Sequence, residues 1–181
     1  MKAAKAKGPR CLGKWCPSSL AKINEPGFVL RGGVVPYVPS TIGREGRVLL
    51  GVKTKNGSYT DFGGGCKIRK KETPFDCAKR EFLEETLGAV TVNPRDITHI
   101  LITGTKQPHQ MVLMIKVKSL DTAEEDYARV YQDAHKPELS RVELFTLGDF
   151  AALQKHQMAE SLYSLHSDIE RIVRGPRDKE N

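Results

Sequence analysis

Long hydrophobic runs are missing from this sequence. No apolar stretch approaches the roughly 20 residues needed to span a bilayer. The start, MKAAKAKGPRCLGKWC, is charged and lacks the apolar segment that a secretion signal requires. We therefore expect an intracellular protein, cytoplasmic or otherwise, with no membrane partner.

Cysteine is scarce and occurs only at positions 11, 16, 66 and 77. Without a secretion signal, this number predicts reduced thiols rather than a disulfide framework. Cys11 and Cys16 have a spacing that zinc ligands can use, but no equally good second pair follows. Because a structural zinc site needs four ligands, zinc binding is the less favoured interpretation.

The sequence also has no internal repeat and no long low-complexity segment. With 181 residues, of which 39% are hydrophobic, the chain is long enough for one well-packed core and short for two. We expect a basic N-terminal arm over residues 1–26 that is free to be flexible. One folded domain should follow over residues 27–174, and then a tail over residues 175–181.

Charge is unevenly distributed. The net charge is +7, and the segment before residue 16 contains no acid. Its basic residues are Lys2, Lys5, Lys7, Arg10 and Lys14. Such an arm is typical of contact with a polyanion, here RNA, although a solubilising terminus explains it equally well. Trp15 is expected to dock the arm as an apolar anchor rather than to stack on a base.

Apolar and β-branched residues gather in six segments that are typical of strands. These segments are residues 28–39, 47–55, 58–62, 96–104, 109–120 and 141–147. The fifth is so apolar that both faces of its strand should be covered. Residues 148–174 predict one or two closing helices, and residues 122–135 a short helix or an acidic loop. Strands on both sides of a central helix predict an α/β fold, with a mixed sheet between helices.

The central helix has a clear start and an unusual end. Thr73 is a natural N-cap. At the other end, Glu81, Glu84 and Glu85 share one face, although anions are unfavourable near a helix C-terminus. Each like-charge pair costs about 0.2–0.5 kcal/mol, and only Arg80 is placed to help. Convergent carboxylates suit a hard divalent cation, so this cluster predicts a Mg²⁺ site.

A loop rich in glycine and basic residues, residues 63–73, precedes the helix. Its glycines allow the backbone to approach a ligand closely, and Gly65 is the candidate carbonyl ligand for the metal. Its basic residues, which are candidates for binding substrate phosphates, are Lys67, Arg69, Lys70 and Lys71. The loop and the acidic helix together indicate metal-assisted phosphoryl chemistry.

Residues 64–88 resemble the Nudix box, written Gx5Ex7REUxEExGU with U a bulky aliphatic residue. The matching residues, in order and spacing, are Glu72, Arg80, Glu81, Phe82, Glu84 and Glu85. The box has one extra residue near each end, because Gly65 stands too far from Glu72 and Gly88 comes late. The resemblance implies the family's α/β/α sandwich over residues 28–174.

The resemblance also implies an activity, which is hydrolysis of a nucleoside diphosphate linked to another moiety with Mg²⁺ or Mn²⁺. Glu81, Glu84 and Glu85 would hold the metals, and Glu81 or Glu85 would also orient or deprotonate the attacking water. Arg80 would fix a glutamate, and Glu72 would hold the loop against the helix. Some relatives add an acid from a later loop, for which the candidates here are Glu124, Glu125, Asp126 and Glu138.

We therefore expect a metal-dependent pyrophosphohydrolase that cleaves a phosphoric anhydride bond of a nucleotide derivative by in-line attack of water on phosphorus. One alternative is decapping at the 5′ end of messenger RNA, which the basic arm and loop favour. Another is hydrolysis of inositol pyrophosphates, which are equally anionic. A Nudix-like module that binds nucleotide or RNA without cleaving it belongs to a different class, and the complete charged set on the helix argues against it.

Overall fold

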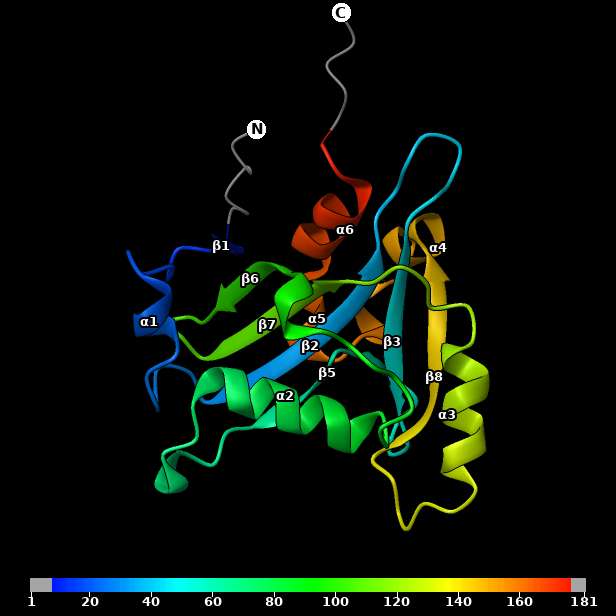
Figure 1. Ribbon diagram of the computed structural model, residues 1–181, viewed down its shortest axis with the longest axis horizontal. Helices are drawn as coiled ribbons and strands as arrows, with labels where there is room; N and C mark the ends of the chain where they lie inside the picture. The colour runs from blue at the N-terminus through cyan, green and yellow to red at the C-terminus, as the bar shows by residue number, and fades with distance from the viewer. Residues whose placement is uncertain (1–7, 177–181) are drawn as a thin grey trace, which may run out of the picture.

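One mixed sheet of eight strands forms the centre of the protein in the computed structural model, which describes residues 8–176 (Figure 1). The strands are β1 Arg10–Leu12, β2 Arg31–Val38, β3 Arg47–Lys53, β4 Tyr59–Thr60, β5 Phe62–Gly65, β6 Ile97–Thr103, β7 Gln110–Lys116 and β8 Leu139–Thr146. Their order is β1-β6-β7-β2-β3-β4, with β5 paired to β2 and β8 to β3. The pairs β2–β7 and β1–β6 are parallel and the other pairs are antiparallel.

Helices cover both faces of this sheet. They are α1 Leu20–Ile23, α2 Pro74–Glu85, α3 Ala123–Tyr131, α4 Leu147–Ala151, α5 Glu160–Tyr163 and α6 His166–Arg174, with 3₁₀ turns η1 Ile68–Lys70, η2 Pro94–Asp96 and η3 Lys155–Gln157. Helices α1, α2 and α3 contribute to one hydrophobic core, and α4, α5 and α6 to a second one (Figure 1). The expected α/β class, with a mixed sheet between helices, is confirmed.

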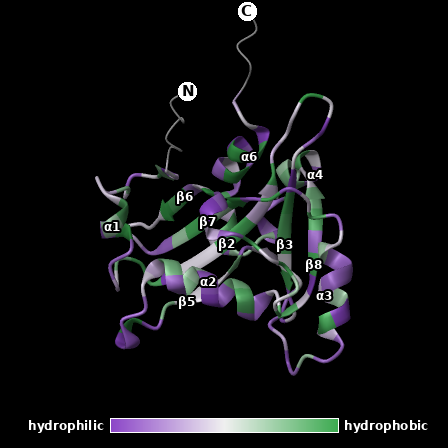
Figure 2. Ribbon diagram, viewed as in Figure 1, coloured by the Kyte–Doolittle hydropathy of each residue, from purple (hydrophilic) through white to green (hydrophobic). Residues whose placement is uncertain are grey.

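The central strands are buried on both faces, as the apolar run at residues 109–120 predicts. In β7, Met111 and Leu113 belong to the core under α2, whereas Val112 and Met114 belong to the core under α6. Each such side chain stabilises the fold by about 1.5–3 kcal/mol when fully buried. Figure 2 shows the resulting hydrophobic centre and the more polar outer helices.

Glycines face each other between β2 and β5. Gly32 pairs with Gly64, and Gly33 with Gly63. A Cβ atom on Gly32 would lie 2.8 Å from the backbone nitrogen of Ala78 in α2, so the helix packs directly on the strand. The segment expected to be a loop from residue 63 therefore begins as a strand, because small residues let it join the sheet.

The closing segment is more broken than expected. Residues 147–174 form three helices and a 3₁₀ turn rather than one or two helices. The chain leaves the helical path near Met158, which is buried and bridges to Tyr59, and Ala159 donates its N–H to the Tyr59 carbonyl at 2.8 Å. A backbone partner on β4 thus competes with helix continuation.

Residues 123–131 form a helix, which decides between the short helix and the acidic loop that were both expected for residues 122–135.

Much of the expected N-terminal arm packs on the domain. Residues 10–12 form β1 against β6, and Ile23 of α1 is fully buried. Trp15 donates its indole N–H to the Gly104 carbonyl at 3.0 Å and packs against the core, in the anchoring role expected for it. The N-terminal lysines at positions 2, 5 and 7 lie outside the described residues, as does the tail from residue 177.

All four cysteines are paired, which contradicts the expectation of reduced thiols. Cys11 is bonded to Cys16 around a turn at Gly13, and Cys66 after β5 is bonded to Cys77 in α2. The Cα atoms of the second pair lie 5.2 Å apart. Cys11 and Cys16 therefore offer no thiolates for zinc. The prediction failed because pairing depends on which residues the fold makes neighbours, and cysteine spacing does not reveal this.

A search of residues 8–176 finds no helix that is both long and apolar enough to cross a membrane.

Candidate active site

Helix α2 begins and ends on specific local interactions. The Thr73 hydroxyl oxygen accepts the Asp76 N–H at 3.2 Å, which caps the start. After Glu85, Leu87 and Gly88 adopt φ angles of 54° and 72°, and Gly88 donates its N–H to the Leu83 carbonyl at 3.1 Å. The extra residue before Gly88 is therefore accommodated in the left-handed turn that closes the helix, beyond the last glutamate.

Arg80 is the centre of the charged cluster. Its Nε and Nη2 atoms donate to the two carboxylate oxygens of Glu72 at 2.7 and 3.0 Å, and Nη2 also donates to the Gly65 carbonyl at 2.9 Å. Its Nη1 donates to Glu81 at 2.5 Å and to Glu84 at 3.1 Å. One guanidinium thus connects the glycine-rich strand, the loop and two helix carboxylates.

Glu72 fastens the loop to this centre. Besides accepting from Arg80, its carboxylate accepts the backbone N–H of Lys67 at 2.6 Å. The hydrogen bond from Arg80 is the main reason that the pKa of Glu72 falls from 4.5 to about 2. Glu72 is therefore charged at neutral pH and links both ends of the loop between β5 and α2.

Glu81 lies against the glycine strand. Its side chain is 13% exposed, and a Cβ atom on Gly64 would collide with its carboxylate group. Gly65, in contrast, has no atom within 4 Å of such a position. The missing side chain at Gly64 therefore makes the space that the Glu81 carboxylate occupies.

Glu85 is the buried member of the cluster. Its carboxylate accepts the Gly63 N–H at 2.6 Å, and it is 7% exposed. Burial, and then the nearby carboxylate of Asp61, raises the pKa of Glu85 from 4.5 to about 8. Glu85 also lines a hollow of about 390 Å³, so this carboxyl group combines a raised pKa with access to a ligand.

A buried ion pair, which sequence reasoning missed, supports the site from the sheet. Arg31 donates to both oxygens of the fully buried Asp61 at 2.7 and 3.0 Å, and also to the Gly63 carbonyl at 2.9 Å. Gln110 and Ser161 extend this network. An arginine and an aspartate inside strand segments were the available signal, because charged residues are rarely fully buried unless paired.

The basic loop residues lie away from that hollow. Lys67, Arg69, Lys70 and Lys71 are exposed in and around η1, and none of them lines the hollow beside Glu85. Cations from a different segment do so, namely Lys53 and Lys55 at the end of β3. The turn after β3 has no motif that would have singled them out.

Among the later acids, Glu138 is the one beside Glu85 in the hollow. Glu124 instead accepts the Leu144 N–H at 2.7 Å, and Asp126 pairs with Arg129 at 3.3 Å. Glu125 is exposed on α3. Glu138 is therefore the candidate that the fold brings to the cluster.

The candidate metal ligands are oxygen atoms, which suit a divalent cation, but several of them accept hydrogen bonds from Arg80 in this structure. Within the range 8–176, no three His, Cys, Asp or Glu side chains are grouped so that they could hold a metal ion. Arg80 binds Glu81 and Glu84, while the side chain of Glu84 is 55% exposed. Carboxylate and carbonyl oxygens are the ligands that Mg²⁺ prefers, and a cation would compensate the buried Glu85 beside Asp61.

Comparison with known proteins identifies no family for this chain. No protein-family model matches it, and no curated protein does so either. Among solved structures, it is similar to Shewanella oneidensis NrtR complexed with a 27mer DNA, at 16% identity and a TM-score of 0.48, over 76% of this chain and 58% of that chain. The chain thus spans little more than half of the NrtR length.

Two further solved structures are similar over most of their own length. One is a hydrolase of the NUDIX family from Clostridium perfringens, at 13% identity and a TM-score of 0.43, over 77% of this chain and 94% of that chain. The other is a mutT/nudix family protein from Listeria innocua, at 15% identity and a TM-score of 0.47, over 77% of this chain and 89% of that chain. With identities this low, the function has to be argued from the site itself.

Proposed function

We propose that the chain is a metal-dependent pyrophosphohydrolase of the Nudix type, acting on a nucleoside diphosphate derivative. The observation that carries this proposal is the Arg80 centre. One guanidinium binds Glu72, Gly65, Glu81 and Glu84, and so places a row of helix carboxylates beside a glycine strand. On a solvated surface helix the like-charged pair Glu81 and Glu85, four residues apart, would only destabilise.

The metal, Mg²⁺ or Mn²⁺, would be held by Glu81, Glu84 and Glu85 with the Gly65 carbonyl. When bound, it would neutralise charge on the pyrophosphate and acidify water. The Arg80–Glu72 pair positions these ligands, because it ties the Gly65 carbonyl and the Glu81 carboxylate to one rigid fork. Lys53 and Lys55 line the hollow beside Glu85, and their positive charges would bind substrate phosphates.

The reaction adds water across a phosphoric anhydride bond. A new P–O bond forms to the water oxygen, and the bond from phosphorus to the bridging oxygen breaks, with its electron pair leaving on the departing phosphate. Glu85 accepts the proton of the water in this proposal. It faces the hollow, where Glu138, Lys53 and Lys55 also lie, so its carboxylate is the one of the three helix carboxylates that is placed beside the space for a ligand.

A panel of nucleotide derivatives, capped RNA and inositol pyrophosphates, each with Mg²⁺ or Mn²⁺, tests the proposal by identifying the released products. Glu85→Gln should lower kcat by about 10²–10⁴-fold. Glu84→Gln should also abolish most turnover while the far-ultraviolet circular dichroism stays unchanged. Glu25→Gln, at an exposed position before β2, is the matched control.

The same experiment separates the enzyme from a binding module. Turnover that is unchanged in both site variants would remove these residues from the mechanism. A chain that binds a nucleotide but releases no product under any metal would support a non-catalytic module instead.

A further inference from the structure

A second hollow lies at the other end of the sheet from Glu85. It has a volume of about 990 Å³ and lies where β1, β6 and β7 meet α6. Along β2, Gly32 beside the candidate site and Tyr37 beside Lys116 are five residues apart, which is about 16 Å of strand. The hollow is therefore separate from the candidate active site.

Basic side chains surround this hollow, which we call the basic groove. Its cations, all exposed, are Arg10, Arg95, Lys116, Lys118 and Arg171. Among the lining residues within the described part of the chain, Asp96 is the one acid. In the range 8–176, Arg171 has a carboxylate within 4 Å, in Asp168, whereas the other four cations have none.

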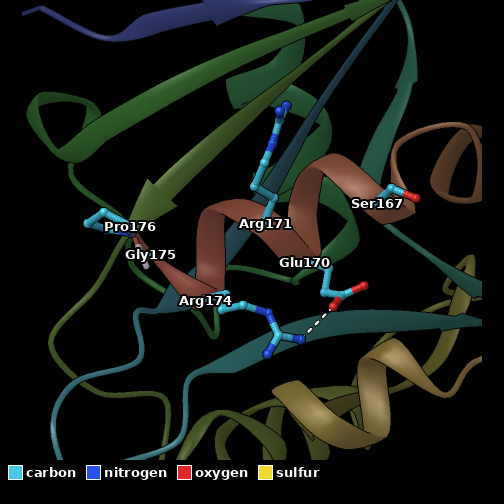
Figure 3. A pocket seen from close by; sticks show the side chains of 6 residues that line it. All are labelled: Ser167, Glu170, Arg171, Arg174, Gly175 and Pro176. Carbon is cyan, nitrogen blue, oxygen red and sulfur yellow. Dashed lines mark hydrogen bonds and ion pairs between the residues drawn. The ribbon is translucent and has the colours of Figure 1, made fainter. Parts of the chain in front are cut away.

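The neighbouring part of α6 is organised differently. There Glu170 and Arg174 pair with each other at 2.5 Å, and Figure 3 shows Arg171 pointing away from that pair. Arg171, Gly175 and Pro176 line both this smaller hollow and the basic groove. Both arginines pair with an acid on their own helix, Arg171 with Asp168 and Arg174 with Glu170, and of the two only Arg171 also lines the groove.

The pKa of His99, which lines the groove, is affected by the neighbouring charges. Burial lowers its pKa below 6.5, and the charges of Arg10 and Arg171 lower it further. The positive charges of Arg10 and Arg171 therefore both act at this position of the groove.

We propose that the basic groove binds the sugar–phosphate backbone of a nucleic acid, independently of base sequence. The five cations come from β1, η2, the end of β7 and α6, so they follow a path rather than a point, as a row of phosphates requires. Guanidinium groups match phosphate geometry. The groove lining contains no Trp, Tyr or Phe for base stacking, which favours phosphate contacts over base readout.

Fluorescence anisotropy with a labelled single-stranded RNA of about 20 nucleotides, measured in EDTA over a range of salt, tests this proposal. Arg95→Ser/Lys118→Ser removes two exposed groove charges. The slope of log K against log salt should become shallower by about 1.4, and affinity at low salt should fall about tenfold. Lys22→Ser/Arg129→Ser removes the same charge elsewhere and should change the slope by far less.

Two results would overturn the proposal. One is an equal change in slope for the groove and control variants, which would mean that net charge alone drives binding. The other is a groove that retains RNA affinity after substitution but loses affinity for a polyglutamate probe, which would point to an acidic protein partner. Because the readout is binding in EDTA without turnover, its outcome does not depend on whether the chain is a hydrolase.

Discussion

Arg80 and Glu72 form a two-pronged ion pair, with Nε–Oε1 and Nη2–Oε2 distances of 2.7 and 3.0 Å. The pair is largely shielded, since the two side chains are 20% and 12% exposed. It joins the centre of α2 to the loop after β5. The arrangement of the candidate active site therefore depends on a contact between two residues that are not proposed to touch the reacting phosphorus.

Arg80→Lys should test that dependence. Lysine keeps the charge but cannot bind Glu72, Glu81 and Gly65 at once, because it lacks the planar fork. We expect the free energy of unfolding, measured by urea denaturation, to fall by about 1–2 kcal/mol. Most of the hydrolytic activity should be lost as well. Arg129→Lys, in an exposed pair with Asp126, should change stability by less than about 0.5 kcal/mol. Equal effects of the two variants would contradict the central role of Arg80.

Glu72 should also make folding sensitive to acid. Its pKa is about 2 in the folded chain against 4.5 normally, so the folded state binds the proton less tightly. The stabilisation is complete above pH 4.5 and is lost as the pH falls towards 2. We expect a loss of about 1–2 kcal/mol across that window after allowance for solvent screening. Glu72→Gln should flatten this part of the pH–stability curve, and an unchanged curve would contradict the assignment.

Gly64→Ala and Gly65→Ala form a matched pair in one strand. A methyl group at Gly64 would collide with the Glu81 carboxylate, whereas at Gly65 it meets open space. Because the displaced group is the end of a flexible side chain, we expect Gly64→Ala to change stability by less than about 1 kcal/mol but to lower kcat at least tenfold. Gly65→Ala should retain activity. Similar kinetics for the two variants would show that the position of Glu81 is unimportant.

The buried pair Arg31–Asp61 makes a prediction about stability. Arg31→Met leaves the Asp61 carboxylate, which is fully buried, without its counterion. We expect a loss of about 3–5 kcal/mol in the free energy of unfolding. The double variant Arg31→Met/Asp61→Asn should recover part of that loss, since the unpaired charge is then removed. If the single variant is as stable as the parent chain, the pair contributes nothing.

The bond between Cys66 and Cys77 should stabilise the site loop. Its two residues are 11 positions apart in the chain, and closing a loop of that size stabilises a protein by up to about 3 kcal/mol. Cys66→Ser/Cys77→Ser should therefore unfold at lower denaturant concentration than the parent chain. Adding a reductant should lower the stability of the parent by at least as much, because it breaks both bonds, but should affect this variant less, since only Cys11–Cys16 remains to be reduced.

Sequence patterns were sufficient for elements whose environment is local or periodic. The apolar run in β7 predicts a strand covered on both faces, and Thr73 predicts the start of α2, because hydrophobic periodicity and capping act over a few residues. The roles of Glu81, Glu84 and Glu85 stay predictions until activity is measured. Their local anomaly, like-charged acids on one face at a helix C-terminus, could be detected from sequence alone.

Long-range neighbours could not be predicted in the same way. Lys53 and Glu138 meet Glu85 only because β3 and β8 are adjacent in the sheet. The pairing of Cys66 with Cys77, and of Arg31 with Asp61, likewise depends on β5 pairing with β2 in the sheet and on α2 packing against both strands. Spacing along the chain contains no information about such contacts.

The facing glycines of β2 and β5 let helix α2 pack close to the sheet. A Cβ atom at Gly32 would already press on the backbone of α2, so the helix cannot come nearer than it does. Any substitution there can move the row of carboxylates outward but never inward. A side chain at Gly32 would therefore displace α2 and its carboxylates away from the sheet. We expect related active chains to keep glycine at this position.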